Sequence, residues 1–167
     1  MKKRSKSGAR PKGTQTAVGG PFLTTAFICE KALNEKDGVQ SFIRVFDRLS
    51  INFSTGEDIE DKRNRTVAIT LAVVFKSGDF KGTKSLEIRV NRTARNETKP
   101  LGKPLEIAFE GGEHGPGVIV EVLFAAFEPD LVWFEVVLDK QIVSKIPLRI
   151  VATEPLSAAR PEPERKR

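Results

Sequence analysis

The sequence predicts an all-β protein, an antiparallel β-sandwich of about eight strands of Greek-key or jelly-roll type. Apolar and polar residues alternate with a period of two over most of the chain, as expected for strands with one buried face. Turn residues separate these segments at short intervals, and no segment carries a convincing helical pattern. A closed barrel is the alternative architecture.

Residues 22–53 predict a hairpin around which we expect the domain to be organised. Residues 22–32 form its first strand, which is apolar on both parities as for a strand covered on both sides. A helix over 26–34 is the competing interpretation, but the β-branched and aromatic content favours a strand. Asp37-Gly38 is the strongest local turn signal.

The second strand of this hairpin, residues 40–53, is predicted to be long and central. Phe46 and Asp47 break its alternation, which predicts a β-bulge at that point. No histidine or second carboxylate accompanies Asp47, so we expect it to bond to nearby backbone. The remaining apolar residues share one parity and form the predicted inward face: Ile43, Val45, Leu49, Ile51 and Phe53.

Six further strands follow, separated by polar loops. Pro104 predicts that the strand beginning there lies at a sheet edge. The loop 53–65 contains four acids followed directly by bases, and its spacing matches no calcium loop, so we interpret it as solvated. Residues 93–103 form another polar loop. The predicted strands span 66–76, 84–92, 104–109, 118–127, 132–138 and 142–150.

Both ends of the chain are predicted to be disordered, which leaves a domain at 21–152. Residues 1–20 form a basic leader with too few apolar groups to offset the entropy of ordering, and 153–167 form a polar tail. The leader alone carries a charge equal to the net +6 of the whole chain, so the domain is nearly neutral. The candidate polyanion-binding residues are the leader's six cations: Lys2, Lys3, Arg4, Lys6, Arg10 and Lys12.

The sequence predicts a cytoplasmic protein without a transmembrane segment. The basic start is not followed by the apolar stretch of a secretory signal, and no apolar run approaches the ~18 residues that a membrane helix needs. Cys29 is the single cysteine and lies in an apolar run, which indicates a buried core residue in a reducing compartment.

Two stretches resemble an uncharacterised family of small bacterial β-sandwich proteins. The first comprises Ile28-Cys29-Glu30, Gly38 and residues 42–49, FIRVFDRL. The second runs from Trp133-Phe134-Glu135-Val136 to residues 146–150, IPLRI. The resemblance implies a sandwich fold and a bacterial, cytoplasmic setting. It implies no activity, because neither stretch carries catalytic residue types.

The residue types argue against an enzyme, a cofactor and a metal. One cysteine and one histidine exclude the common structural zinc sets, and a nucleophile, base and orienting group are not found together. Glu110, Glu113 and His114 could form a weak metal site. The surrounding glycines favour a turn instead.

The leading hypothesis is a non-enzymatic binding or scaffold module that meets a protein partner through loops or strand edges. One alternative is an accessory protein that contacts nucleic acid or another polyanion weakly and nonspecifically through the basic leader, which could equally be a solubilising tail. Another is a carbohydrate-binding or carboxylate-based hydrolase sandwich. That function would need Glu121 and Glu135 to face each other across adjacent strands, or Trp133 to meet a sugar.

Overall fold

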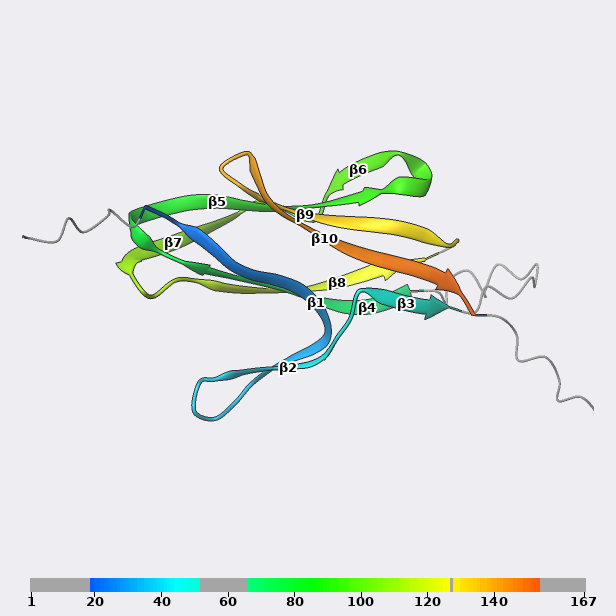
Figure 1. Cartoon of the computed structure of the whole chain (residues 1–167), viewed down its shortest axis with the longest axis horizontal. Coiled ribbons are helices and arrows are strands. Elements are labelled where there is room, and N and C mark those ends of the chain that lie inside the picture. The colour runs from blue at the N-terminus through cyan, green and yellow to red at the C-terminus, as the bar shows by residue number, and fades with distance from the viewer. Residues whose placement is uncertain (1–18, 52–65, 127, 154–167) are drawn as a thin grey trace, which may run out of the picture.

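The computed structural model describes residues 19–51, 66–126 and 128–153, which form two β-sheets packed face to face (Figure 1). The predicted β-sandwich is confirmed. The predictions for the leader, the acidic loop and the tail lie almost entirely outside these residues. The described residues form ten strands, β1 (Phe22–Asn34), β2 (Gln40–Val45), β3 (Arg48–Ile51), β4 (Thr66–Lys76), β5 (Gly78–Arg92), β6 (Glu97–Pro100), β7 (Leu105–Gly112), β8 (Gly117–Ala125), β9 (Asp130–Leu138) and β10 (Gln141–Ala152), and one 3-10 turn, η1 (Thr93–Arg95).

Sheet A has the strand order β2-β1-β4-β8, and sheet B has the order β3-β10-β9-β5-β6, with β7 also paired to β5. Strands β6 and β7 pair with successive parts of β5, so they form one return strand interrupted at residues 101–104. The pairing of β10 with β3 is parallel, whereas the other strand pairs are antiparallel.

The order of the strands in the two sheets matches a known type of β-sandwich. The order β1-β4-β8 opposite β10-β9-β5-β6 is the strand order A-B-E opposite G-F-C-C′ of an immunoglobulin-type sandwich. The chain has one cysteine and therefore cannot form the disulfide that joins the two sheets of antibody domains. Because one fold hosts many functions, this likeness carries no functional conclusion.

The core lies between the two sheets and follows the predicted alternation. In β4 the residues of one parity, from Val67 to Phe75, face sheet B and pack in the core. Phe75 and Phe80 each meet Phe109 edge to face, with ring centroids 5.8 and 5.7 Å apart, which closes one end of the core. Phe134 of β9 is fully buried against the same cluster.

The predicted long central strand over residues 40–53 is wrong. Its first part, β2, is an edge strand of sheet A, and its second part, β3, is an edge strand of sheet B. The two residues that break the alternation carry the chain from one sheet to the other. The amide of Phe46 donates to the carbonyl oxygen of Ile28 (3.1 Å), and the carbonyl oxygen of Asp47 accepts from the amide of Arg149 (2.7 Å). These bonds join the sheets at one side. The bond at Asp47 is made by its main-chain carbonyl, so it does not test the bond to nearby backbone that was predicted for the Asp47 side chain.

The predicted inward face of residues 40–53 holds only in its second half. Leu49 and Ile51 pack against the core, whereas Ile43 and Val45 are 39% and 59% exposed. Arg44 has a φ of 51°, and this left-handed conformation interrupts the regular strand between them.

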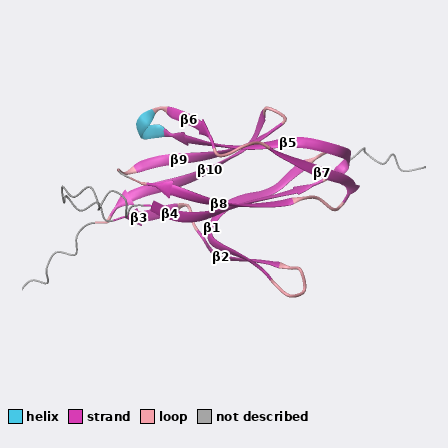
Figure 2. Ribbon diagram, turned by 180° about the vertical axis from the view of Figure 1, so that it is seen from behind, coloured by secondary structure: helices cyan, strands magenta, loops and turns pink. Residues whose placement is uncertain are grey.

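The far half of the β1–β2 hairpin folds back beneath the outer face of sheet A (Figure 2). Its Asp37-Gly38 turn is as predicted. Phe42 of β2 meets Phe27 of β1 edge to face at 4.8 Å. Cys29 lies on this outer face and is fully buried, but Thr24 and Thr25 are exposed, so the first strand is covered on both sides only around Ile28 and Cys29.

Two predicted loops contain regular structure. Strand β5 begins at Gly78, so residues 78–83, which lie between the predicted strands 66–76 and 84–92, belong to a strand. The predicted loop 93–103 contains η1 and β6. Strand β7 starts after Pro104 and pairs with no described strand except β5, which confirms the predicted edge position.

Candidate functional site

Among the described residues, both sheets end in strands that have a neighbour on one side only. Sheet A is bounded by β2 and β8, and sheet B by β3 and by the return strand β6–β7. The free side of such a strand presents unpaired backbone N–H and C=O groups, to which another extended chain can pair. Natural proteins protect these edges with short strands, prolines, lysines or local distortions. The four edges can therefore be compared by how they are protected.

Three of the four edges are protected. Strand β3 has only four residues. Strand β2 is distorted at Arg44, where φ is positive. The return strand contains Lys99, Pro100 and Pro104 around Gly102, whose φ of 78° breaks the extended backbone. The longest strand on these three edges is β7, and its regular part ends at Glu110, because φ is positive at Gly111 and Gly112. None of the three edges therefore offers a regular row of backbone groups as long as that of β8.

Strand β8 lacks all of these protections. It runs for nine regular residues paired to β4 without a bulge, and it contains no proline, lysine or arginine. Val118, Val120 and Val122 pack toward the core. On the opposite face Leu123 is 78% exposed, the most exposed large apolar side chain of the described residues. We take this edge, residues 117–125, as the candidate functional site.

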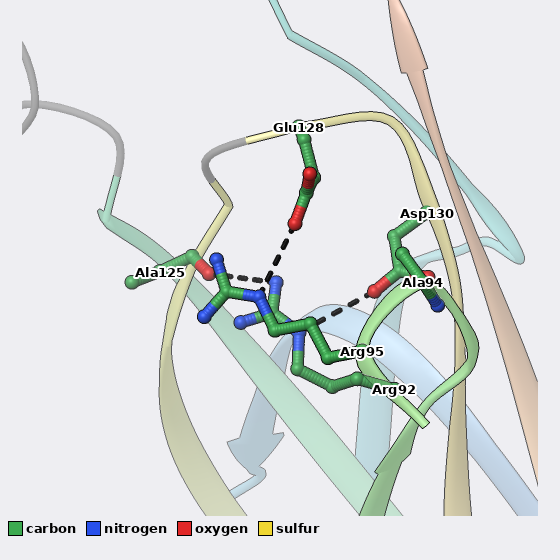
Figure 3. A network of polar contacts seen from close by, with 6 residues as sticks. All are labelled: Arg92, Ala94, Arg95, Ala125, Glu128 and Asp130. Carbon is green, nitrogen blue, oxygen red and sulfur yellow. Dashed lines mark hydrogen bonds and ion pairs between the residues drawn. The ribbon is translucent and has the colours of Figure 1, made fainter. Parts of the chain in front are cut away.

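A buried polar network fixes the far end of β8 (Figure 3). The Arg92 guanidinium of β5 donates to the carbonyl oxygen of Ala125 (3.1 Å) and pairs with Asp130 through its Nε (3.4 Å). Asp130 also accepts from the amide of Ala94 (2.9 Å), so both of its carboxylate oxygens are used. The outer pair of Arg95 and Glu128, at 3.2 Å, spans the same corner.

This network links the two sheets where β8 ends and β9 begins, because β5 belongs to sheet B and Ala125 to sheet A. The side chain of Asp130 is only 1% exposed. A buried, hydrogen-bonded ion pair holds a corner in one geometry, since breaking it would leave an uncompensated charge. The free edge of β8 is thus supported by a fixed corner.

The predicted metal candidates are not assembled into a site. Glu113 and His114 are both strongly exposed, and Glu113 Oε1 lies 3.9 Å from His114 Nε2. In the described parts of the chain, no three His, Cys, Asp or Glu side chains are grouped to hold a metal. The segment serves the fold: the amides of Phe75 and Ser77 donate to the carbonyl oxygens of Pro116 and His114.

The proposed carboxylate pair is also separated. Glu121 lies on β8 in sheet A and Glu135 lies on β9 in sheet B, so these strands are not neighbours. Glu121 is exposed, whereas Glu135 is buried and pairs with Lys145 at 2.8 Å. The two acids therefore do not face each other, and the hydrolase hypothesis loses the pair on which it depended.

Cys29 is buried as predicted, but on the outer face of sheet A and not in the cluster between the two sheets. Burial raises the pKa of its thiol above the ordinary value of 9.0, which keeps the thiol protonated at neutral pH.

The six leader cations predicted to bind polyanions lie outside the described residues. The described residues contain no helix long and apolar enough to cross a membrane.

The sequence pattern of β8 gave a partial signal for this edge. Residues 118–126 are apolar on both parities except at Glu121. This pattern is typical of a strand covered on both faces, but Leu123 is exposed.

No protein-family model and no curated protein matches the chain.

Proposed function

We propose that this protein is a non-enzymatic binding module that adds an extended segment of a partner protein to sheet A along β8. The observation that carries the proposal is that β8 is a long, regular edge strand without protecting residues. Strand addition derives affinity from main-chain hydrogen bonds and specificity from alternate side chains. A strand of nine residues offers enough backbone groups for such pairing.

The side chains of β8 define the chemistry of the partner segment. Ile119, Glu121 and Leu123 alternate with the three valines that point into the core, so they lie on the outer face. Glu121 forms no ion pair with any described residue. Opposite charges on neighbouring strands stabilise a sheet. The partner should therefore place a lysine or arginine beside Glu121, with apolar residues two positions away on each side.

A second copy of the chain fits this edge less well than such a segment. Antiparallel pairing of two β8 strands about their midpoint would place Glu121 beside Glu121 of the other copy. Like charges directly opposite each other destabilise a sheet. A shift of register would relieve the repulsion but would leave part of the edge unpaired.

The test uses the full chain and two synthetic peptides that alternate valine and threonine around one central residue. This residue is lysine in one peptide and glutamate in the other. The lysine peptide should slow amide exchange at residues 117–125, and Leu123→Lys should weaken its binding about tenfold. Ile142→Lys is the matched control, because Ile142 is also exposed but lies on β10.

The proposal fails if neither peptide binds or if the protection appears outside β8. It also fails if the control variant loses as much affinity as Leu123→Lys. Equal binding of both peptides would remove the assigned role of Glu121. A self-association that Leu123→Lys abolishes would replace the partner segment by a second copy.

The proposal includes a bacterial, cytoplasmic setting. It rests on the lone buried Cys29, which suits a reducing compartment, and on the resemblance of residues 28–49 and 133–150 to bacterial sandwich proteins. Detection of the protein in the soluble cytoplasmic fraction of its host would test this part, and its recovery from the envelope or the medium would refute it.

A further inference from the structure

The outer face of sheet B carries a groove that is independent of β8. The parallel register of β10 and β3 aligns Arg149 with Arg48, and the antiparallel register of β9 and β10 aligns Trp133 with Pro147. These residues lie in adjacent rows on one surface. The groove has a volume of about 330 Å³ and is lined by Asp47, Arg48, Leu131, Trp133, Pro147 and Arg149.

The two arginines of the groove differ from the other cations on this face. Lys145 pairs with Glu135 at 2.8 Å, and Arg89 pairs with Glu87 at 2.8 Å. Within the part of the chain that the structure describes, Arg48 and Arg149 form no ion pair.

Asp47 is the one acid among the described residues that line the groove, and these residues together carry a surplus of positive charge. Its carboxylate pairs with neither arginine, although its carbonyl oxygen accepts from the amide of Arg149. The groove therefore offers two guanidinium groups whose charges are not neutralised by direct contact with any described side chain.

Aligned like charges on neighbouring strands repel and destabilise a sheet. Adjacent strands lie about 4.8 Å apart, so the guanidinium groups of Arg48 and Arg149 can both reach one bound anion. The planar guanidinium binds phosphate through paired N–H groups. A phosphate in the groove would turn this repulsion into two attractive contacts.

Trp133 supplies the second half of a recognition site. Its indole is partly exposed in the groove, in the row next to the arginines. An accessible aromatic ring beside a basic groove binds unpaired bases by stacking, whereas the bases of a duplex are stacked on one another. We propose that this groove binds a nucleotide, with its phosphate on Arg48 and Arg149 and its base on Trp133.

Two sources share this chemistry, a free mononucleotide and single-stranded nucleic acid. Trp133 is the only tryptophan of the chain, so its fluorescence reports on this groove alone. The full chain is titrated at physiological salt with adenosine monophosphate and with a single-stranded oligothymidylate. Saturable quenching by the mononucleotide identifies a nucleotide site. Quenching by the oligonucleotide alone identifies a single-strand site.

The combined variant Arg48→Gln and Arg149→Gln should lower the affinity for the ligand that quenches Trp133 about tenfold or more. The control is Lys99→Gln with Lys103→Gln, which removes the same charge from residues on or next to the β6 edge. It should change the affinity less than about twofold, because screening reduces distant effects at this salt. Inorganic phosphate should compete for the arginines without quenching Trp133.

Three results would overturn the proposal. The first is the absence of saturable quenching by both ligands. The second is an equal loss of affinity in the arginine and lysine variants, which would reduce the effect to overall charge. The third is equal quenching by a glutamate-rich peptide of the same charge as the oligonucleotide, which would show that the groove binds acidic protein segments.

Discussion

At the residue scale, Asp130 is the polar side chain on which the corner beside β8 depends. Its two oxygens accept from Arg92 and from the amide of Ala94, and it is almost completely buried. Replacing one partner of a buried ion pair lowers the free energy of unfolding by more than the intact pair contributes to it. The remaining charge is then buried with neither its partner nor water around it. The sequence analysis placed residues 128–131 in a loop between two predicted strands and gave no sign of this bond.

We predict that Asp130→Ala lowers the free energy of unfolding by about 3–5 kcal/mol. Glu128→Ala is the control, because Glu128 and Arg95 form a pair that is nearly half exposed. It should cost no more than about 1 kcal/mol. Urea unfolding of both variants measures the difference. Equal, small losses would show that the buried pair does not stabilise the corner.

At the element scale, the β9–β10 turn shows how a local signal is completed by a distant strand. Asp139 and Lys140 both have positive φ, as a two-residue hairpin turn of type I′ requires. The Asp139 carboxylate accepts from Lys84 Nζ (2.6 Å) and from the amide of Ser85 (3.0 Å). The turn is thereby attached to β5. The sequence analysis placed residues 139–141 between two predicted strands, but their attachment to β5 depends on the tertiary structure.

These bonds predict a pH dependence of stability. The hydrogen bond from Lys84, followed by that from Ser85, lowers the pKa of Asp139 below its ordinary value of 3.8. The unfolded chain therefore binds this proton at a higher pH than the folded chain does. The stabilisation is complete above about pH 3.8 and is lost as the pH falls through the lower folded pKa.

Asp139→Asn should make the stability fall less steeply with pH below about 4, and Lys84→Gln should reduce the same slope because it removes the main cause of the shift. Unfolding midpoints in urea between pH 2 and pH 5 provide the measurement. Slopes identical to that of the unmodified protein in both variants would exclude Asp139 as a source of the acid sensitivity.

At the scale of the whole molecule, the position of a strand within its sheet decides how much free energy of unfolding is lost when one of its apolar side chains is truncated. Leu71 lies on β4, which has neighbours on both sides and is buried on its inner face, whereas Ile43 lies on the exposed edge strand β2. Leu71→Ala should cost about 2–5 kcal/mol, and Ile43→Ala should cost less than about 1 kcal/mol. Thermal and urea unfolding compare the two. A larger loss at Ile43 would place β2 in the core, as the sequence had indicated.

The sequence by itself determined the fold class, most strand segments and the inner face of β4, because a period of two records which face of a strand is buried. It also determined the Asp37-Gly38 turn and the burial of Cys29. Only the tertiary structure decided that residues 40–51 divide between two sheets, that β8 is an open edge and that Arg48 aligns with Arg149. Strand neighbours and register depend on contacts between residues far apart in the chain, and local alternation does not record them.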